Sequence, residues 1–153
     1  MFDLSDPAPG FILPASDGSE IDLSSLRGKN VVLFFYPRDN TPGCTKEAIG
    51  FTEALQEFEA ANTKVFGVSK DSLVSHEKFV TKKDLGMPLL SDENHTVSED
   101  YGVWKEKKMY GKTFMGIERS TFLIDAEGRV AGIWRKVKVD GHVAEVLEAA
   151  QAL

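Results

Sequence analysis

The feature that most constrains the fold is the run from Val31 to Tyr36, which is apolar at every position and is followed by Pro37. β-branched and aromatic residues fill this run, as they commonly do in strands. A strand with one face in water would alternate apolar and polar residues, whereas this run has no polar face. It therefore predicts a strand at the centre of a sheet whose two faces are both covered.

Shorter patterns on either side predict further strands and helices in alternation. Asp17-Gly18 is a turn signal between two β-rich segments, so residues 11–23 are expected to form a β-hairpin. The other strands are expected at residues 64–69, 88–90, 120–124 and 130–134, and helices at about 42–58, 72–84 and 141–152. The order predicts an α/β fold, with a mixed sheet and helices on both faces.

The chain has 153 residues, which fits one domain over residues 1–153. Its net charge of -6 makes binding to nucleic acid or to an anionic membrane through charge alone unfavourable. The short basic cluster of Lys105, Lys107 and Lys108 is expected in a solvated surface loop. The first residues do not resemble a signal peptide, and no apolar run is long enough to span a bilayer, so a cytoplasmic protein is expected.

The single cysteine, Cys44, cannot form a disulfide within the chain. It is expected in the first turn of a helix, after Thr41 at the N-cap and Pro42 at the first helical position. Unpaired backbone N–H groups and the helix dipole favour an anion there, and the thiolate is the nucleophilic form of cysteine. The alternative is a small buried core cysteine, which the polar, Gly- and Pro-rich neighbours disfavour.

Pro37, Thr41 and Cys44 have the spacing Pro-x-x-x-Thr-x-x-Cys, which resembles the active-site signature of the peroxiredoxins. The longer stretch over residues 36–47 is similar to the peroxiredoxin Q subfamily, also called the bacterioferritin comigratory proteins. Residues 116–125 and 134–139 resemble later segments of the same subfamily. The resemblance implies a thioredoxin-like sheet with flanking helices and an N-terminal hairpin, and a thiol-dependent peroxidase that needs no cofactor.

The resemblance also assigns roles. Cys44 matches the peroxidatic cysteine, and Thr41 is expected to place a hydroxyl beside it, in addition to a capping role. Pro37 would shield the pocket from water, as well as ending a strand. Arg119 matches an arginine whose guanidinium stabilises the thiolate and orients an oxygen atom, with an ordinary surface ion pair as the alternative. Backbone N–H groups near Gly43 and Cys44 would bind the peroxide.

Glu47 lies one helical turn beyond Cys44, on nearly the same face. An unpaired carboxylate at that place would disfavour the thiolate. Pairing with a cation removes the conflict, and Arg119 is the expected partner. The alternative is a solvated glutamate that the helix dipole stabilises.

One departure from the subfamily changes the expected cycle. Many of its members carry a second, resolving cysteine five residues after the first, where this chain has Ile49, and others carry it on the next helix, where residues 72–84 contain none. The chain is therefore expected to be a one-cysteine variant, and its resemblance to the subfamily suggests a monomer. Its sulfenic acid would wait for an external thiol, and thioredoxin, glutaredoxin and glutathione all stay open.

Other functions are considered beside the peroxidase. A redox sensor or adaptor, in which oxidation of Cys44 changes partner binding, is a second hypothesis. A thiol–disulfide reductase is disfavoured because the chain lacks Cys-x-x-Cys. His76, His95 and His142 show no metal-ligand spacing, so no metal site is expected and all three are interpreted as structural or surface residues.

Overall fold

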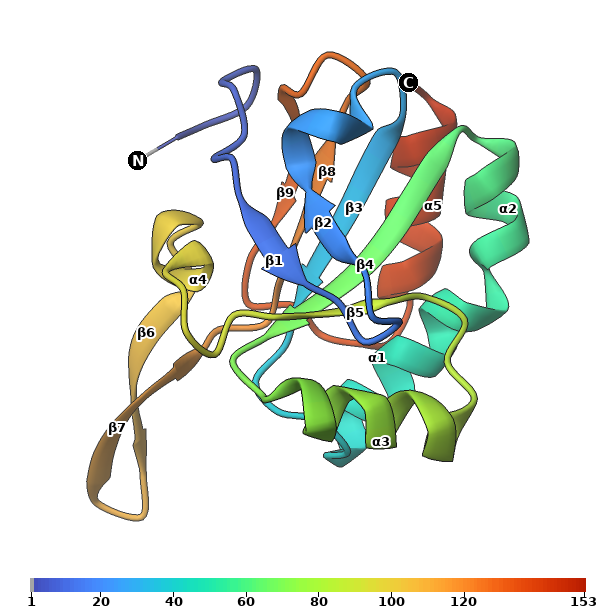
Figure 1. The fold of residues 1–153 in the computed structure, drawn as a ribbon. Coiled ribbons are helices and arrows are strands. Elements are labelled where there is room, and N and C mark those ends of the chain that lie inside the picture. The colour runs from blue at the N-terminus through green and yellow to red at the C-terminus, as the bar shows by residue number, and fades with distance from the viewer. Residues whose placement is uncertain (1) are drawn as a thin grey trace.

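The computed structural model describes residues 2–153, so residue 1 of the expected domain lies outside it. Its centre is a five-stranded mixed sheet in the order β5-β4-β3-β8-β9 (Figure 1). The strands are β3 (Asn30–Phe35), β4 (Thr63–Ser69), β5 (Leu89–Ser91), β8 (Ser120–Ile124) and β9 (Val130–Trp134). Strand β3 pairs in parallel with β4 and antiparallel with β8. The predicted α/β mixed sheet with a buried central strand is confirmed.

The side chains of β3 and of the residue after it divide between two hydrophobic clusters, as the two-residue period of a strand requires. Leu33 and Phe35 belong to one cluster, and Phe34 and Tyr36 belong to the other. None of these four side chains is more than 1% exposed. The core therefore lies on both faces of the sheet, with β3 between its two halves.

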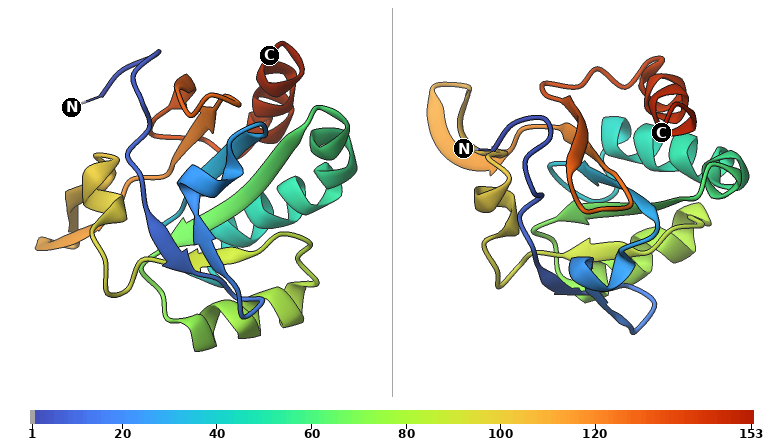
Figure 2. Two further views of the ribbon diagram at one scale, coloured as in Figure 1. Left: turned by 45° about the horizontal axis from the view of Figure 1, so that its top comes forward. Right: turned by 90° about the horizontal axis from the view of Figure 1, so that it is seen from above.

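The longer helices share the face of Phe34 and Tyr36. They are α1 (Pro42–Glu53), α2 (Leu55–Ala60), α3 (Leu73–Lys83) and α5 (His142–Gln151) (Figure 2). Buried residues of all four belong to that cluster. The other face is covered by the hairpin of β1 (Ile12–Pro14) and β2 (Glu20–Asp22), the 3₁₀ helix η1 (Leu23–Leu26) and the short helix α4 (Val97–Asp100). The expectation of helices on both faces thus holds only through η1 and α4. Right-handed crossovers that advance in one direction, from β3 to β4 to β5, place their helices on the same face.

The helix expected over residues 42–58 is two helices. The backbone N–H of Ala54 donates to the carbonyl of Phe51 at 3.1 Å, a three-residue step that ends α1 before α2 begins. Phe51 and Phe58 are nevertheless both fully buried, so the apolar stripe continues across the break. The other predicted strands and helices lie within about one residue of their expected bounds.

The prediction of a surface loop at the lysine cluster was wrong. Strands β6 (Trp104–Met109) and β7 (Lys112–Ile117) form a hairpin that extends away from the sheet (Figure 1). Tyr110 and Gly111 join them, both with positive φ (52° and 74°), as a tight type I′ turn requires. Lys105 and Lys108 are exposed on β6, whereas Lys107 is half-buried. The charged composition of β6 gives no apolar alternation from which a strand could be predicted.

No helix within residues 2–153 combines the length and the apolar character needed to cross a bilayer.

Gly67 gives a test of how tightly the helix-covered face of the sheet is packed. A Cβ at this position of β4 would lie 2.7 Å from Leu89 Cδ2 and 2.7 Å from Phe34 Cζ. We expect Gly67→Ala to lower the free energy of unfolding by about 1–3 kcal/mol through overpacking, measured by urea denaturation. Gly10→Ala is the control, because Gly10 is exposed and has no atom within 4 Å of an added Cβ. Equal stability of the two variants would contradict this packing.

Candidate active site

Cys44 lies in the first turn of α1, which follows β3 after a short loop at the end of the sheet. The residue is only 2% exposed and belongs to the same hydrophobic cluster as Phe51. Its burial matches the core-cysteine alternative, but its nearest polar partner does not, because a guanidinium contacts the sulfur. A buried sulfur with a cationic partner is the environment of a reactive thiolate and not of an inert core thiol.

Arg119 provides that cation. Ser120, the next residue, pairs with Phe35 at the end of β3, so Arg119 lies beside the start of α1. Its Nη2 donates to Cys44 Sγ at 3.3 Å and its Nη1 donates to Glu47 Oε1 at 2.7 Å. Burial lowers the pKa of Arg119, but the negative charges of Glu47 and Cys44 outweigh that effect and raise it above its ordinary value. The guanidinium therefore stays charged and donates to Cys44 and to Glu47 from one planar fork.

Gly43 makes room for this contact. A Cβ on Gly43 would lie 3.1 Å from Arg119 Nη2, closer than most side chains tolerate. The missing side chain lets the guanidinium lie against the first turn of α1, near the backbone that carries Cys44. A glycine is therefore useful here for close approach and not for an unusual backbone angle.

Glu47 is fully buried, so the alternative of a solvated first-turn glutamate is wrong, and the expected ion pair with Arg119 is present. Its Oε2 has no hydrogen-bond partner among the described residues. Burial raises the pKa of Glu47 to about 7, and the opposing effect of Arg119 is smaller. The carboxyl therefore takes up a proton more readily than a free glutamate does, despite its guanidinium partner.

His142 is a neighbour of the site that sequence reasoning missed. It begins α5, is 4% exposed, and places Nε2 4.0 Å from Glu47 Oε2. The same nitrogen lies 2.8 Å from the hydroxyl oxygen of Thr121. Burial lowers the pKa of His142 to about 4, so the ring is neutral at neutral pH. No spacing in the sequence connects His142 with α1, because only the packing of α5 against α1 brings them together.

Thr41 and Pro37 lie near the site but make different contacts from those expected. Thr41 occupies the N-cap position, yet its hydroxyl donates to the Arg38 carbonyl at 2.9 Å and to no amide of the helix. Within residues 2–153, the hydrogen bond to Cys44 Sγ comes from Arg119. Pro37 lies two residues beyond Phe35, the last residue of β3, and is exposed. The catalytic roles of Thr41 and Pro37 stay predictions.

Lys107 is a second cation near the thiol that the sequence did not indicate. Its side chain crosses Gly116, where a Cβ would lie 3.2 Å from Lys107 Cδ, and its amine donates to the Ile117 carbonyl. Burial and the positive charge of Arg119 lower the pKa of Lys107, whereas Cys44 and Glu118 act to raise it. The β6–β7 hairpin therefore adds positive charge to the surroundings of the sulfur.

Comparison with known proteins identifies the family. Residues 4–133 match the AhpC/TSA family. The chain is 50% identical to the putative peroxiredoxin Bcp of Coxiella burnetii, over 95% of this chain and 96% of that protein. It is 48% identical to peroxiredoxin Bcp of Bacillus subtilis, over 95% and 93%. The chain belongs to the Bcp (peroxiredoxin Q) subfamily of the peroxiredoxins. It is a thiol-dependent peroxidase, as the resemblance around Cys44 predicted.

Solved structures agree with the fold of this peroxiredoxin. The bacterioferritin comigratory protein of Xanthomonas campestris, solved to study its alkyl peroxide reduction activity, gives a TM-score of 0.88 at 46% identity over 93% of this chain and 90% of that one. A cysteine-to-serine variant of Xylella fastidiosa PrxQ gives a TM-score of 0.94 at 40% identity, over 99% and 97%. The predicted thioredoxin-like fold with an N-terminal hairpin is confirmed.

The pair of Glu47 and His142 predicts how stability depends on pH. Folding raises the pKa of Glu47 from 4.5 to about 7 and lowers that of His142 from 6.5 to about 4. Between about pH 4.5 and 6.5, the unfolded chain carries the proton on His142 and the folded peroxiredoxin carries it on Glu47. The two contributions therefore oppose each other in the wild type, and single variants separate them.

In His142→Asn, Glu47 is the one member of the pair that still contributes to the pH dependence of the free energy of unfolding. Its stabilising contribution is complete below pH 4.5 and is lost as pH rises through about 7. In Glu47→Gln, His142 is the member that contributes. Its stabilising contribution to the free energy of unfolding is complete above pH 6.5 and is lost as pH falls through about 4. Each is worth up to about 3 kcal/mol at 1.36 kcal/mol per unit of pKa. Urea unfolding between about pH 4 and 8 should give opposite slopes, and slopes of the same sign would contradict the assignment.

Proposed function

We propose that this peroxiredoxin reduces hydrogen peroxide and organic hydroperoxides through a sulfenic acid on Cys44, which an external thiol then resolves. The observation that carries the proposal is the fork of Arg119, which donates to Cys44 Sγ and to Glu47 at once. A cation fixed against the sulfur supports the thiolate before reaction and the charge on the peroxide during it. Glu47 fixes that cation in turn.

The chemical step is a nucleophilic displacement. The Cys44 thiolate attacks the terminal oxygen of the hydroperoxide, a sulfur–oxygen bond forms, and the oxygen–oxygen bond breaks. Sulfur is oxidised to the sulfenic acid, and the leaving oxygen takes a proton from water and departs as water or an alcohol. Arg119, the Thr41 hydroxyl and backbone N–H groups near Gly43 and Cys44 are proposed to stabilise the developing charge. Pro37 is proposed to limit access of water.

The absence of a second cysteine in the sequence supports resolution by another molecule. Ile49, at the position of the resolving cysteine in many relatives, is 36% exposed and lines a groove with Val143 between α1 and α5. An external thiol would condense with the sulfenic acid, release water and form a mixed disulfide, which a second thiol would reduce. Thioredoxin, glutaredoxin and glutathione are the reductants proposed, with the chain acting as a monomer in the cytoplasm.

Organic hydroperoxides are included because the X. campestris relative is described by its alkyl peroxide reduction. A second candidate function is peroxide sensing, in which oxidised Cys44 alters the binding of a partner. The burial of Cys44 and the lack of an internal resolving thiol favour a sulfenic acid that lasts. Steady-state peroxide consumption with each reductant supplied separately distinguishes turnover from sensing.

Replacing the nucleophile tests the central claim. Cys44→Ser should abolish NADPH-coupled peroxide consumption and keep the fold, since a serine hydroxyl stays protonated near neutral pH and is similar in size. Wild-type protein treated with peroxide should add dimedone, seen as a mass increase, and should form no intramolecular disulfide. Consumption by Cys44→Ser above the uncatalysed background would contradict the proposal.

Replacing the cation tests the geometry. Arg119→Ala should slow oxidation of Cys44 by about 10²- to 10³-fold, the usual loss when a donor that stabilises an anionic transition state is removed. Arg119→Lys keeps the charge but cannot reach both partners with a planar fork. Its oxidation rate should therefore lie between those of the wild type and Arg119→Ala. Stopped-flow fluorescence measures these rates. Arg129→Ala is the control, because Arg129 is exposed and bonds to the Ser5 carbonyl. Equal rates in all four proteins would count against a role for Arg119.

A further inference from the structure

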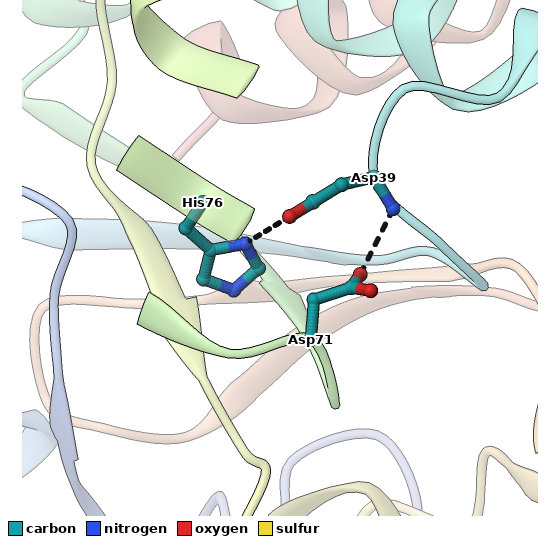
Figure 3. A group of neighbouring side chains, drawn as sticks. All are labelled: Asp39, Asp71 and His76. Carbon is teal, nitrogen blue, oxygen red and sulfur yellow. Dashed lines mark hydrogen bonds and ion pairs between the residues drawn. The ribbon is translucent and has the colours of Figure 1, made fainter. Parts of the chain in front are cut away.

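Another group of titratable side chains lies beside the loop that leads into α1. The polar atoms of Asp39, Asp71 and His76 are within 4.8 Å of one another (Figure 3). Asp39 is in the loop between β3 and α1, Asp71 follows β4, and His76 is on α3. Three segments that are distant in sequence are therefore joined next to the residues that carry the peroxidatic cysteine.

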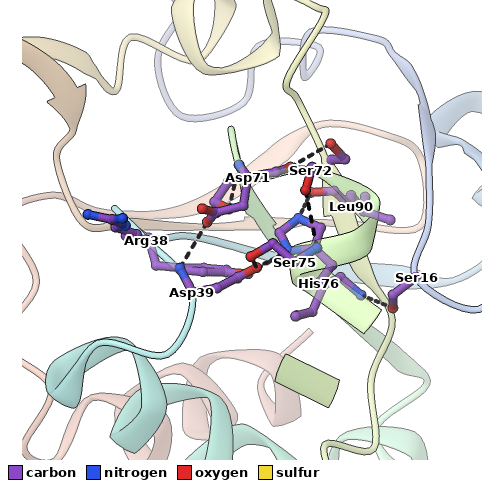
Figure 4. Close-up of polar contacts among 12 residues, drawn as sticks. Ser16, Arg38, Asp39, Asp71, Ser72, Ser75, His76 and Leu90 are labelled. Atoms are coloured by element: carbon purple, nitrogen blue, oxygen red, sulfur yellow. Dashed lines mark hydrogen bonds and ion pairs between the residues drawn. The ribbon is translucent and has the colours of Figure 1, made fainter. Parts of the chain in front are cut away.

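The carboxylate of Asp39 is surrounded by donors. Its Oδ1 accepts a hydrogen bond from the Tyr36 hydroxyl at 2.6 Å. Its Oδ2 accepts one from the Ser75 hydroxyl at 2.8 Å (Figure 4). The same Oδ2 lies 2.7 Å from Nδ1 of His76. These contacts surround a carboxyl group that is only 8% exposed, and hydrogen bonds of this kind favour the charged form of a carboxyl.

The ring of His76 faces an acceptor on each side. Its Nε2 lies 2.9 Å from the Leu90 carbonyl oxygen, which can only accept, so this nitrogen carries a hydrogen. At Nδ1, a carboxylate Oδ2 of Asp39 that already accepts the Ser75 hydroxyl can only accept again, so the hydrogen would come from the ring. A neutral imidazole has one N–H group and cannot satisfy both contacts. A ring with hydrogens on both nitrogens would satisfy both contacts, and His76 is fully buried.

The backbone of the loop between β3 and α1 is also fixed by hydrogen bonds, in addition to the side chain of Asp39. Asp71 Oδ2 accepts the backbone N–H of Asp39 at 2.9 Å and the hydroxyl of Ser69 at 2.6 Å. Arg38, the residue before Asp39, accepts the Thr41 hydroxyl through its carbonyl, and the Thr41 carbonyl accepts the N–H of Thr45 in the first turn of α1. The position of Asp39 therefore determines that of Thr41 and of the first turn.

We propose that Asp39 and His76 form a charged pair that positions the loop before α1 and so controls how Cys44 and Thr41 are presented to the peroxide. The proposal rests on the proposed peroxidase function. Neither side chain is placed on the reacting atoms, and both act through the loop, so they are positioning residues. The pair couples α3 to the active-site helix, although α3 supplies no group to the chemistry.

Nuclear magnetic resonance tests the charge directly. In wild-type protein labelled with ¹⁵N-histidine, both ring nitrogens of His76 should carry hydrogens at pH 8, which only an imidazolium shows. His142 is the internal reference for the neutral pattern, because burial lowers its pKa to about 4. In Asp39→Asn, the amide can donate to Nδ1, so His76 should become neutral with its hydrogen on Nε2. A neutral His76 in the wild type would overturn the proposal.

Two reactions of Cys44 separate positioning from simple structural support. Asp39→Asn and His76→Asn should slow oxidation by hydrogen peroxide about 10- to 100-fold, as small misplacements at an active site do. Alkylation by iodoacetamide, which needs the thiolate but no bound peroxide, should stay near the wild-type rate. His95→Asn is the matched control, since His95 is exposed. Peroxide rates that do not change, or that fall in proportion to alkylation, would overturn the positioning role.

A milder variant covers the case in which Asp39→Asn does not fold. Ser75→Ala removes one hydrogen bond to Asp39 Oδ2 and keeps both charges. It should lower the ratio of the peroxide rate to the alkylation rate by less than His76→Asn does, and an unchanged ratio would count against the pair. If the wild type itself fails to react with peroxide, the proposed function is wrong, whereas the histidine spectrum still decides whether the charged pair exists.

Discussion

The structure depends on the complete burial of β3. Because both faces of this strand are covered, polar groups are accommodated only at its end. The loop and the first turn of α1, which carries Cys44, lie there. The aromatic rings of Phe34 and Phe51 stack with centroids 4.6 Å apart and hold α1 to the strand. The antiparallel pairing of Phe35 with Ser120 brings the neighbouring Arg119 to the same end of the sheet. A nucleophile and its cation are thus brought together by strand register, which the core fixes.

Local sequence patterns predicted most of the fold because burial leaves a period in the sequence. The strand at 31–36 and the helix at 141–152 could be located from their apolar residues alone. The β6–β7 hairpin could not, because most of its residues are exposed and the partly buried ones do not recur at every second position. The end of α1 at Ala54 was equally hidden, since the apolar stripe passes through it. Such features follow from tertiary contacts that no short window contains.

The site was predictable to the extent that its residues belong to one motif or to a recognisable later segment. Cys44, Glu47 and Arg119 were found in that way, and an electrostatic conflict at Glu47 suggested its partner. His142 and Lys107 were missed because each reaches the site singly, from α5 or from the hairpin, with no spacing to mark it. Asp39 and His76 were missed for the same reason. Contacts of this kind depend on how elements pack, and one sequence alone does not report packing.

The break between α1 and α2 bears on how a large reductant reaches a sulfur that is 2% exposed. The helical hydrogen-bond ladder from Pro42 ends at Glu53, so α1 is a cooperative unit of 12 residues. Helices of about this length are marginal on their own in water, and their first turn frays before their centre. Opening can therefore start at Cys44 and stop at Ala54, while α2 and the strand that follows it stay folded. The free energy of exposing the oxidised sulfur is then that of opening α1 and its packing on the sheet, and not that of unfolding the whole protein.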